Sequence, residues 1–386
     1  MLPFEYFNPT LVIFGQERIA ELSRLIPAQS RVMVLYGGGS VKRFGTLAEV
    51  RQALEPRYVV EFGGIEPNPS YETLMEAVEL VKSQRIDFLL AVGGGSVIDG
   101  TKFVAAAALY EHPDTWSMME GFGRHIQQAL PLGVVLTLPA TGSEMNDGAV
   151  ITNKALTAKL PFLNEKVFPQ FAILDPTKSY TLPERQVANG VVDAYIHILE
   201  QYLTYPIDAM VQDRFAESLL KILLEIGPKA LQEPENYSLR ANLMWVATLA
   251  LNGLIGAGVP QDWATHAMGH EMTALYGIDH ARTLAIVLPA MLQVRQEEKR
   301  AKLLQYAERV WDLREGDEQS RIDQAIHLTR SFFEQMGLPT RLSDYGLGVE
   351  AIDQIVNQLC QHGMVQLGER GTVTPDISRA VLNAAV

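Results

Sequence analysis

The stretch Asp87–Gly100, DFLLAVGGGSVIDG, decides how the first half of the chain folds. Its apolar run ends in three glycines, and residues 96–110 that follow have helical spacing. A short apolar run followed by glycine is typical of a buried strand. A strand that passes through a tight turn into a helix is the unit from which parallel sheets are built.

The same order of apolar run and helix recurs on either side of this stretch. Further strands are expected at residues 31–36, 58–62, 133–138 and 171–174, and further helices at residues 46–54 and 71–82. Alternating strands and helices predict a parallel sheet with helices on both faces. The first half is therefore expected to be a Rossmann-like α/β domain.

The pattern changes after Asp175. Thr181 and Glu184 fit a capping box, and almost only helical spacing follows to the end of the chain. Apolar stripes such as 215–226 and 303–311 are typical of helices packed in a core. We expect an α/β domain over residues 1–180 and an all-helical domain over residues 181–386.

The composition excludes several classes of protein. The chain has 386 residues, a formal net charge of −13 and a single cysteine, Cys360. A strongly acidic chain is unsuited to general binding of nucleic acid or of an anionic membrane surface. One cysteine excludes an internal disulfide framework and a cysteine-rich zinc site. No apolar run approaches the ~20 residues that span a bilayer, and no signal-type segment begins the chain, so a cytoplasmic protein is expected.

Two glycine turns, Gly93–Gly95 and Gly37–Gly39, each lie between a predicted strand and helix. Glycine lets the backbone approach a ligand closely, and a helix N-terminus suits a phosphate. The Gly93–Gly95 turn is not the G-x-G-x-x-G fingerprint, because Ile98 stands where its third glycine would be, and it is not a P-loop. One such turn is as readily structural, but two in one parallel sheet favour a dinucleotide at the carboxyl ends of the strands.

The residues around the first turn favour NADP over NAD. Ser40, Lys42 and Arg43 follow Gly37–Gly39, and no acidic residue ends the preceding strand. An acid there would bind a ribose 2′-hydroxyl and repel a 2′-phosphate. The alternative is that Lys42 and Arg43 are ordinary solvated charges at a helix start. Hydroxyls at a further strand end, on Thr137, Thr141 and Ser143, would also lie where a cofactor binds.

Histidines mark the second half as a candidate metal-binding region. Asp193 and His197 are four residues apart and share a helix face, as do His266 and His270, and His280 follows soon after. A carboxylate with several imidazoles suits a divalent metal such as zinc or iron. These five positions exceed the usual four ligands, and spacing does not say which residue has another role.

The other histidine patterns indicate neither a zinc protease nor further metal ligands. The zinc-protease motif H-E-x-x-H fails because Ala274 stands at its second histidine. The remaining histidines lie among polar residues and are expected at the surface; they are His112, His125, His327 and His362.

Taken together, these motifs resemble the iron-activated (group III) alcohol dehydrogenase family over essentially the whole chain. The residues that carry the resemblance are Gly93-Gly94-Gly95-Ser96-Val97-Ile98-Asp99, Thr141-Gly142-Ser143-Glu144, Asp193 with His197, and His266 with His270 and His280. Residues 36–42, 66–69 and 258–266 look like the bacterial NADPH-dependent aldehyde reductase or butanol dehydrogenase branch. One departure is Ala140, where many relatives have glycine.

The resemblance implies a site that the spacing alone does not. Its metal ligands match Asp193, His197, His266 and His280, which leaves His270 close to the substrate as the candidate catalytic residue. Cofactor contacts are implied for Gly94, Gly95, Ser96, Asn68, Thr137, Thr141 and Lys159, beside the turn at Gly37, Gly38, Gly39 and Ser40 and the motif residues Asp99 and Ser143. The architecture implied is the dehydroquinate synthase-like one, and homodimers are expected.

The expected function is interconversion of aldehydes and primary alcohols with NADP(H) and one divalent metal, iron or zinc. The α/β domain would bind the dinucleotide, and the helical domain would bind metal and substrate. Alternatives are a polyol dehydrogenase of the glycerol type, a lyase resembling dehydroquinate synthase, and a non-enzymatic protein that binds metal or nucleotide.

Overall fold

The computed structural model describes all 386 residues, which form two compact units. The first unit comprises Phe7–Pro183 and Glu233–Thr248, and the second comprises Met1–Tyr6, Glu184–Gln232 and Leu249–Val386. None of the helices has the length and apolar character needed to cross a membrane.

The first unit is built on a six-stranded sheet in the order β1-β8-β5-β4-β2-β3, with every neighbouring pair parallel. The strands are β1 (Leu11–Phe14), β2 (Arg31–Tyr36), β3 (Tyr58–Phe62), β4 (Phe88–Gly94), β5 (Leu132–Leu138) and β8 (Phe171–Leu174). The predicted parallel sheet is confirmed. Edge strand β1 and an antiparallel hairpin of β6 (Gly148–Asn153) and β7 (Ala158–Leu163) lie outside the prediction.

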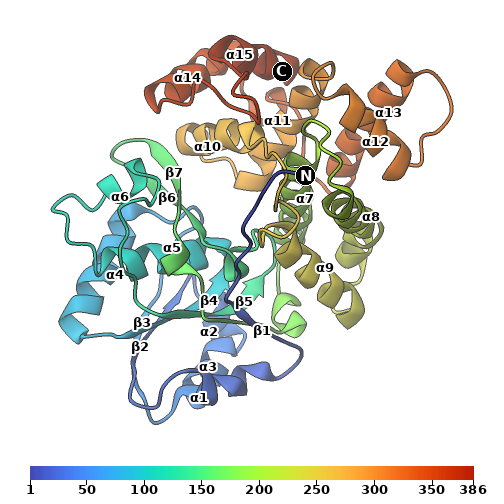
Figure 1. Cartoon of the computed structure of the whole chain (residues 1–386). Coiled ribbons are helices and arrows are strands. Elements are labelled where there is room, and N and C mark those ends of the chain that lie inside the picture. The colour runs from blue at the N-terminus through green and yellow to red at the C-terminus, as the bar shows by residue number, and fades with distance from the viewer. The chain divides into compact units, whose positions relative to one another are not determined.

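Helices cover both faces of this sheet. They are α1 (Leu22–Leu25), α2 (Ser40–Arg43), α3 (Thr46–Leu54), α4 (Tyr71–Gln84), α5 (Gly95–Ala107) and α6 (Ser117–Glu120). Figure 1 shows α1 and α3 on one side of the sheet and α4 and α5 on the other. On the α1 and α3 side, Leu22 and Val50 pack with strand residues Val34 and Leu90, all of them buried, because alternate residues of a strand face the same layer.

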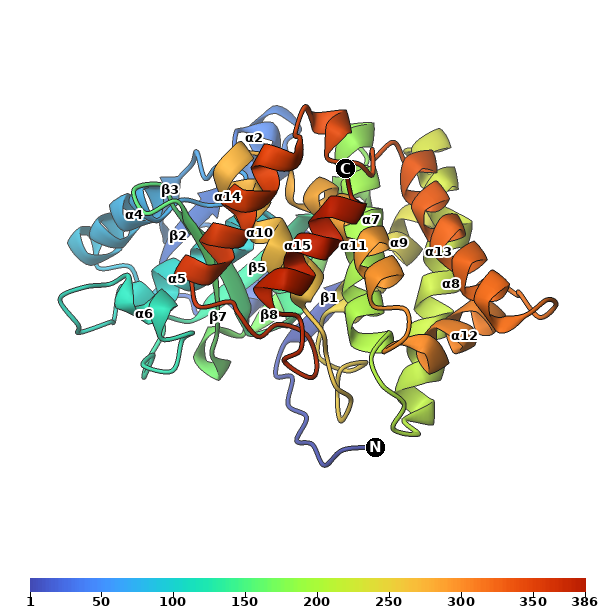
Figure 2. The same cartoon turned by 90° about the horizontal axis from the view of Figure 1, so that it is seen from above.

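The second unit is helical. It contains α7 (Glu184–Tyr202), α8 (Met210–Gln232), α10 (Ala264–Tyr276), α11 (His280–Val294), α12 (Arg300–Arg309), α13 (Glu318–Gln335), α14 (Val349–Gln361) and α15 (Pro375–Ala384). Helix α9 (Tyr237–Ala250) belongs to the first unit up to Thr248. Figure 2 shows α7, α11 and α15 side by side, in agreement with their packing.

The ends of α10 are fixed by local chemistry. At its start, Asp262 Oδ1 accepts the N–H of Ala264 at 3.0 Å and thereby satisfies a helix donor. At its end, Gly277 has a φ of 68°, the left-handed conformation that glycine adopts without strain. The chain then turns at once into α11, whose first residue is His280. This tight connection brings the histidines of α10 and α11 together.

Candidate metal centre and cofactor-binding turns

Four side chains from α7, α10 and α11 converge within the second unit. The Oδ1 atom of Asp193 lies 3.7 Å from Nε2 of His197 and 3.7 Å from Nε2 of His280. The rings of His197 and His266 are stacked with centroids 4.7 Å apart, and those of His266 and His280 are 5.2 Å apart. The structure therefore brings together the four residues that the resemblance assigns to a metal.

These residues fit a divalent metal. Two ligand atoms about 2.1 Å from one tetrahedral zinc ion would lie about 3.4 Å apart, close to the separations observed here. Asp193 is 3% exposed, and its Oδ1 is buried and accepts no hydrogen bond. A buried carboxylate oxygen is costly unless a donor or a cation satisfies it. Asp193, His266 and His280 each offer a ligand atom within 4.8 Å of the others.

Burial keeps His197 in the neutral form that a metal ligand requires. Burial lowers the pKa of His197 to about 4, and the attraction of the Asp193 charge only partly opposes this. The imidazole is consequently neutral at pH 7. Neutral imidazole is the form that binds a metal, so little proton release is required at this position.

His270 lies beside the four predicted ligands. Its ring centroid is 5.1 Å from that of His280 and 6.1 Å from that of His266, and the residue is 7% exposed. It thus lies next to two of the predicted ligands.

One prediction about the histidines is wrong. His362 is not a surface residue, because its side chain is largely buried and its Nδ1 lies 2.7 Å from Oε1 of Glu271 on α10. Burial raises the pKa of Glu271, and the nearby His362 opposes that rise. The two residues are far apart in sequence, so local polarity around His362 was a poor guide to its surroundings.

Sequence reasoning missed one residue at this centre, Glu200. Glu200, buried on α7, contacts Nδ1 of His266 and accepts the N–H of Thr265 at 2.8 Å. Burial, with the charge of Asp262 nearby, raises the pKa of Glu200 well above its usual range. Trp263 lies with its ring 5.3 Å from His266 and 6.2 Å from His197. The available signal for Glu200 was its position one helical turn after His197.

In the first unit, the two predicted cofactor turns differ in how closely other residues pack against their glycines. A Cβ on Gly94 would lie 2.8 Å from Cβ of Leu138, and one on Gly95 would lie 2.6 Å from the Thr141 side chain. Close packing of the β4–α5 turn against the end of β5 therefore requires both glycines. A Cβ on Gly38 would meet nothing within 4 Å, so the space beside this glycine is open to a ligand.

Three predicted contact residues meet beside the β4–α5 turn. Lys159 Nζ donates to Oδ1 of Asn68 at 2.8 Å, and the N–H of Asn68 donates to Oγ of Ser96 at 3.3 Å. Asn68 has a φ of 56°, a conformation that asparagine tolerates better than most residues. The structure thus places an amide, a hydroxyl and a buried cation at the start of α5.

Asp99 and Ser143 are engaged within the protein. Asp99 accepts hydrogen bonds from Oγ of Ser143 at 2.6 Å and from the N–H of Val150 at 2.9 Å. Burial raises the pKa of Asp99, which the neighbouring Lys102 opposes. These bonds join α5 to β6 and to the segment after β5, where Thr141 Oγ1 accepts the N–H of Ser143 at 3.2 Å. Thr137 lies near the end of β5 and is partly exposed.

The first turn has an acidic neighbour that the sequence did not reveal. Glu61 on β3 lies 3.8 Å from Nζ of Lys42 and is paired with Arg51. Lys42 also lies over the ring of Tyr36, at 4.9 Å from its centroid. No acidic residue ends the strand before this turn, but Glu61 on the neighbouring strand lies beside the turn in space. Two cations nevertheless neutralise the Glu61 charge.

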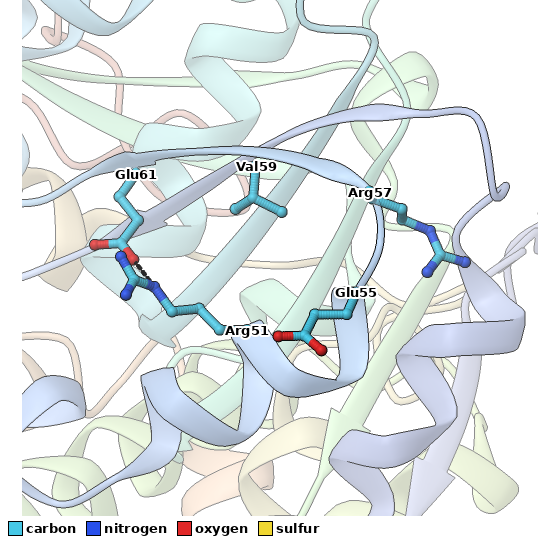
Figure 3. A pocket seen from close by; sticks show the side chains of 5 residues that line it. All are labelled: Arg51, Glu55, Arg57, Val59 and Glu61. Carbon is cyan, nitrogen blue, oxygen red and sulfur yellow. Dashed lines mark hydrogen bonds and ion pairs between the residues drawn. The ribbon is translucent and has the colours of Figure 1, made fainter.

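A surface hollow of about 360 Å³ lies between α3 and β3, as Figure 3 shows. Its lining residues are Arg51, Glu55, Arg57, Val59 and Glu61. The guanidinium of Arg57 donates to backbone carbonyls, and that of Arg51 pairs with Glu61. The hollow contains none of the predicted site residues, and its cations are already engaged.

Two family models match the chain, one over the part with the predicted cofactor turns and one over the part with the candidate metal centre. Residues 9–176 match the family model "Iron-containing alcohol dehydrogenase", and residues 187–378 match "Fe-containing alcohol dehydrogenase family, C-terminal". The chain is 60% identical over 383 residues to the NADPH-dependent aldehyde reductase YqhD of Escherichia coli K12, covering 99% of both chains. It is 41% identical to the probable NADH-dependent butanol dehydrogenase 1 of Bacillus subtilis 168, over 94% of this chain and 95% of that protein.

A solved structure of the same relative also matches the whole chain. The crystal structure of YqhD from Escherichia coli K-12 matches with a TM-score of 0.99 and 59% identity, covering 100% of this chain and 99% of that one. The two family models together span nearly the whole chain, and the metal-binding geometry lies in the part that the second model matches. The chain belongs to the iron-containing alcohol dehydrogenase family.

Proposed function

We propose that the chain is a metal-dependent, NADPH-linked aldehyde reductase that interconverts aldehydes and primary alcohols. The observation that carries this proposal is the group of Asp193, His266 and His280, whose ligand atoms lie within 4.8 Å of one another, with Nε2 of His197 3.7 Å from Oδ1 of Asp193. Support for the cofactor and the substrate class comes from the NADPH-dependent aldehyde reductase that is 60% identical over 99% of the chain.

The ligand set suits activation of a carbonyl group. A divalent metal, iron or zinc, would supply a Lewis acid there and stabilise negative charge on the substrate oxygen. Asp193 brings one negative charge, and three neutral imidazoles bring none, so the protein leaves a net positive charge at the centre. His197 supports this arrangement because burial keeps it neutral at pH 7.

His270 is the proposed proton-transfer residue. Its ring lies beside those of His266 and His280, yet the resemblance leaves it outside the ligand set. Histidine is suited to exchange a proton with an alkoxide near neutral pH. We assign it the role of passing a proton between the substrate oxygen and solvent.

The first unit would hold the dinucleotide, and bound NADPH would supply the hydride. The pyrophosphate would meet Gly94, Gly95 and Ser96, and the open space at Gly38 allows close approach of another part of the cofactor to the backbone of the first turn. The group formed by Ser96, Asn68 and Lys159 would offer hydrogen bonds and a positive charge to the cofactor. Lys42 and Arg43 would favour the 2′-phosphate of NADPH.

One set of assays tests this function. Protein with measured metal content is mixed with NADPH or NADH and with short or long aldehydes, and loss of the reduced-cofactor absorbance is followed. We expect oxidation of NADPH that depends on both aldehyde and metal. Activity with NADH alone would overturn the cofactor assignment. Absence of turnover with every aldehyde, or a reaction limited to glycerol, would overturn the substrate class.

We also propose a homodimer that acts in the cytoplasm, where NADPH is available as a reductant. Strand β1 supports the dimer because it forms one edge of the sheet and exposes Leu11 and Phe14. An edge strand with apolar side chains readily pairs with another chain. Sedimentation analysis and fractionation of cells test these two statements.

A further inference from the structure

Glu200 is a buried carboxylate with a defined place beside the candidate metal centre. It is 3% exposed and lies on α7, one turn after His197. One carboxylate oxygen accepts the N–H of Thr265 at 2.8 Å, and the other contacts Nδ1 of His266. Both partners belong to the first turn of α10, so one side chain joins two of the helices that carry the predicted ligands.

These contacts constrain the ring of His266. With a cation bound nearby, the Glu200 carboxyl would ionise despite its burial; it then only accepts hydrogen bonds, so Nδ1 of His266 carries the proton. The other ring nitrogen, Nε2, then keeps its lone pair and is the atom that can bind a metal. Carboxylates that bond to the far nitrogen of a ligating histidine fix its tautomer and orientation in this way.

We propose that Glu200 is a positioning residue for the metal: it holds His266 in the tautomer and orientation that present Nε2 to the ion. Glu200 does not itself reach the ion in this role. It acts through His266.

Further backbone and side-chain contacts fix the position of Glu200 relative to the start of α10. The carbonyl of Glu200 accepts the N–H of Asp262 at 2.9 Å, and Asp262 Oδ1 in turn accepts the N–H of Ala264, the first residue of α10. Lys299, which is 3% exposed, pairs with Asp262 at 2.7 Å and with Glu369 at 3.0 Å. This buried junction fixes the start of α10 relative to the end of α7, so the contact between Glu200 and His266 does not depend on a mobile loop.

The substitution Glu200→Gln tests the role at nearly constant volume. An amide has one accepting oxygen and one donating nitrogen. If the oxygen faces His266, the amide nitrogen opposes the N–H of Thr265. If the nitrogen faces His266, Nδ1 must accept, and the proton moves to Nε2, where it blocks the metal. In either orientation the ligand is poorly held.

The measurement is the affinity of the metal-free chain for Zn²⁺, titrated against a competing chelator. For Glu200→Gln we expect affinity about 10- to 100-fold weaker than for the wild type, the usual loss when such a partner is removed. The matched control is Glu217→Gln on α8, another buried carboxylate that accepts hydrogen bonds from Tyr202 and Arg309 and touches no predicted ligand. It should lower the unfolding temperature and leave the zinc affinity unchanged.

Wild-type zinc affinity in a folded Glu200→Gln chain would overturn the proposal, as would an equal loss in both variants. If Glu200→Gln does not fold, Glu200→Asp replaces it. This variant keeps the charge but withdraws the carboxylate by one methylene, and it should also bind zinc more weakly. The proposal rests on the proposed metal dependence, yet the titration uses Zn²⁺ without aldehyde or NADPH. Failure to reduce aldehydes would therefore leave its outcome unaffected.

Discussion

At the scale of single residues, Asp193 sets the charge of the candidate metal centre. It is the one carboxylate among the four predicted ligands, and its Oδ1 faces Nε2 of both His197 and His280. Replacement by a neutral group would raise the net charge of the occupied centre by one unit. The retention of metal should therefore depend strongly on this residue.

Asp193→Asn is expected to lower the metal content after dialysis at least tenfold. The amide keeps the shape of the side chain but loses the negative charge that stabilises a buried cation. Metal analysis of the purified protein measures this. Asp213→Asn, which removes a carboxylate from the junction of α8 and α12, is the control and should keep its metal. Full metal content in the Asp193 variant would contradict the ligand assignment.

His270→Ala should separate metal binding from proton transfer. Because His270 is outside the proposed ligand set, the variant should hold one metal per chain. Its kcat for aldehyde reduction should fall about 10²- to 10⁴-fold, the usual contribution of a positioned acid or base. The pH profile of kcat should also lose the limb that this histidine contributes. Loss of metal from the variant would make His270 a ligand instead.

At the scale of the elements, the two glycine turns of the sheet have different physical demands. The β4–α5 turn is packed tightly against Leu138 and Thr141, whereas the β2–α2 turn is open at Gly38. Packing thus requires glycine in one turn, whereas in the other it leaves space that the proposed cofactor would occupy.

Gly95→Ala should consequently impair stability, whereas Gly38→Ala should impair cofactor binding. The first places a Cβ 2.6 Å from Thr141. It should lower the free energy of unfolding by about 1–3 kcal/mol, as overpacking does. The second should change stability by less than about 0.5 kcal/mol, as exposed substitutions usually do, and should weaken NADPH binding. Urea unfolding and NADPH titration measure the two effects. Unchanged NADPH binding in Gly38→Ala would remove this turn from the cofactor site.

The start of helix α4 is sensitive to acid through Glu66. One oxygen of Glu66 accepts hydrogen bonds from Ser70, which caps α4, and from Thr73 and Lys154. Burial favours the neutral carboxyl, but the Lys154 contact and the other hydrogen bonds outweigh it and lower the pKa of Glu66 to about 2. The carboxylate therefore stabilises the folded state most at pH values above its unfolded-state pKa of 4.5.

That stabilisation is lost as the pH falls from 4.5 towards 2, because the unfolded chain takes up the proton first. Glu66→Gln should be less stable than the wild type at pH 6, and the difference should shrink over this window. Denaturant unfolding of both proteins at a series of pH values measures it. A difference that stays constant with pH would show that the charge of Glu66 contributes nothing.

At the scale of the whole molecule, the free edge of the sheet bears on assembly. The N–H groups of Leu11 and Gly15 donate towards β8, so that of Val12, at the alternate position of β1, points to the open edge. Val12→Pro should remove this donor and weaken the proposed dimer, whereas Val12→Ala keeps the donor and should not. Sedimentation over a range of concentrations measures both. An equally stable dimer in Val12→Pro would place the interface elsewhere, and a monomeric wild type would overturn the dimer.

Much of this organisation could be predicted from the sequence because its signals are local. Apolar runs ending in glycine predict the central strands, and the spacing of Asp193 with His197 and of His266 with His270 predicts candidate site residues on shared helix faces. Strand β1 has only four residues, and its partner β8 is distant in sequence. Pro161 within β7 disguises the hairpin, since proline is uncommon in strands.

The residues whose surroundings were missed had little local signal beyond the position of Glu200 one helical turn after His197. Glu200 and His362 owe their roles to partners on other helices, His266 and Glu271. Only the packing of helices shows that each of these pairs is in contact.

The convergence of α7, α10 and α11 on the proposed metal site also has a thermodynamic consequence. Asp193 and His280 are far apart along the chain, so an ion bound by both acts as a reversible cross-link that only the folded chain can form. The stability of the protein then becomes a function of free metal concentration and rises by about 4 kcal/mol when the metal exceeds its dissociation constant a thousandfold. Preparations that differ in metal occupancy will accordingly differ in heat resistance as well as in turnover.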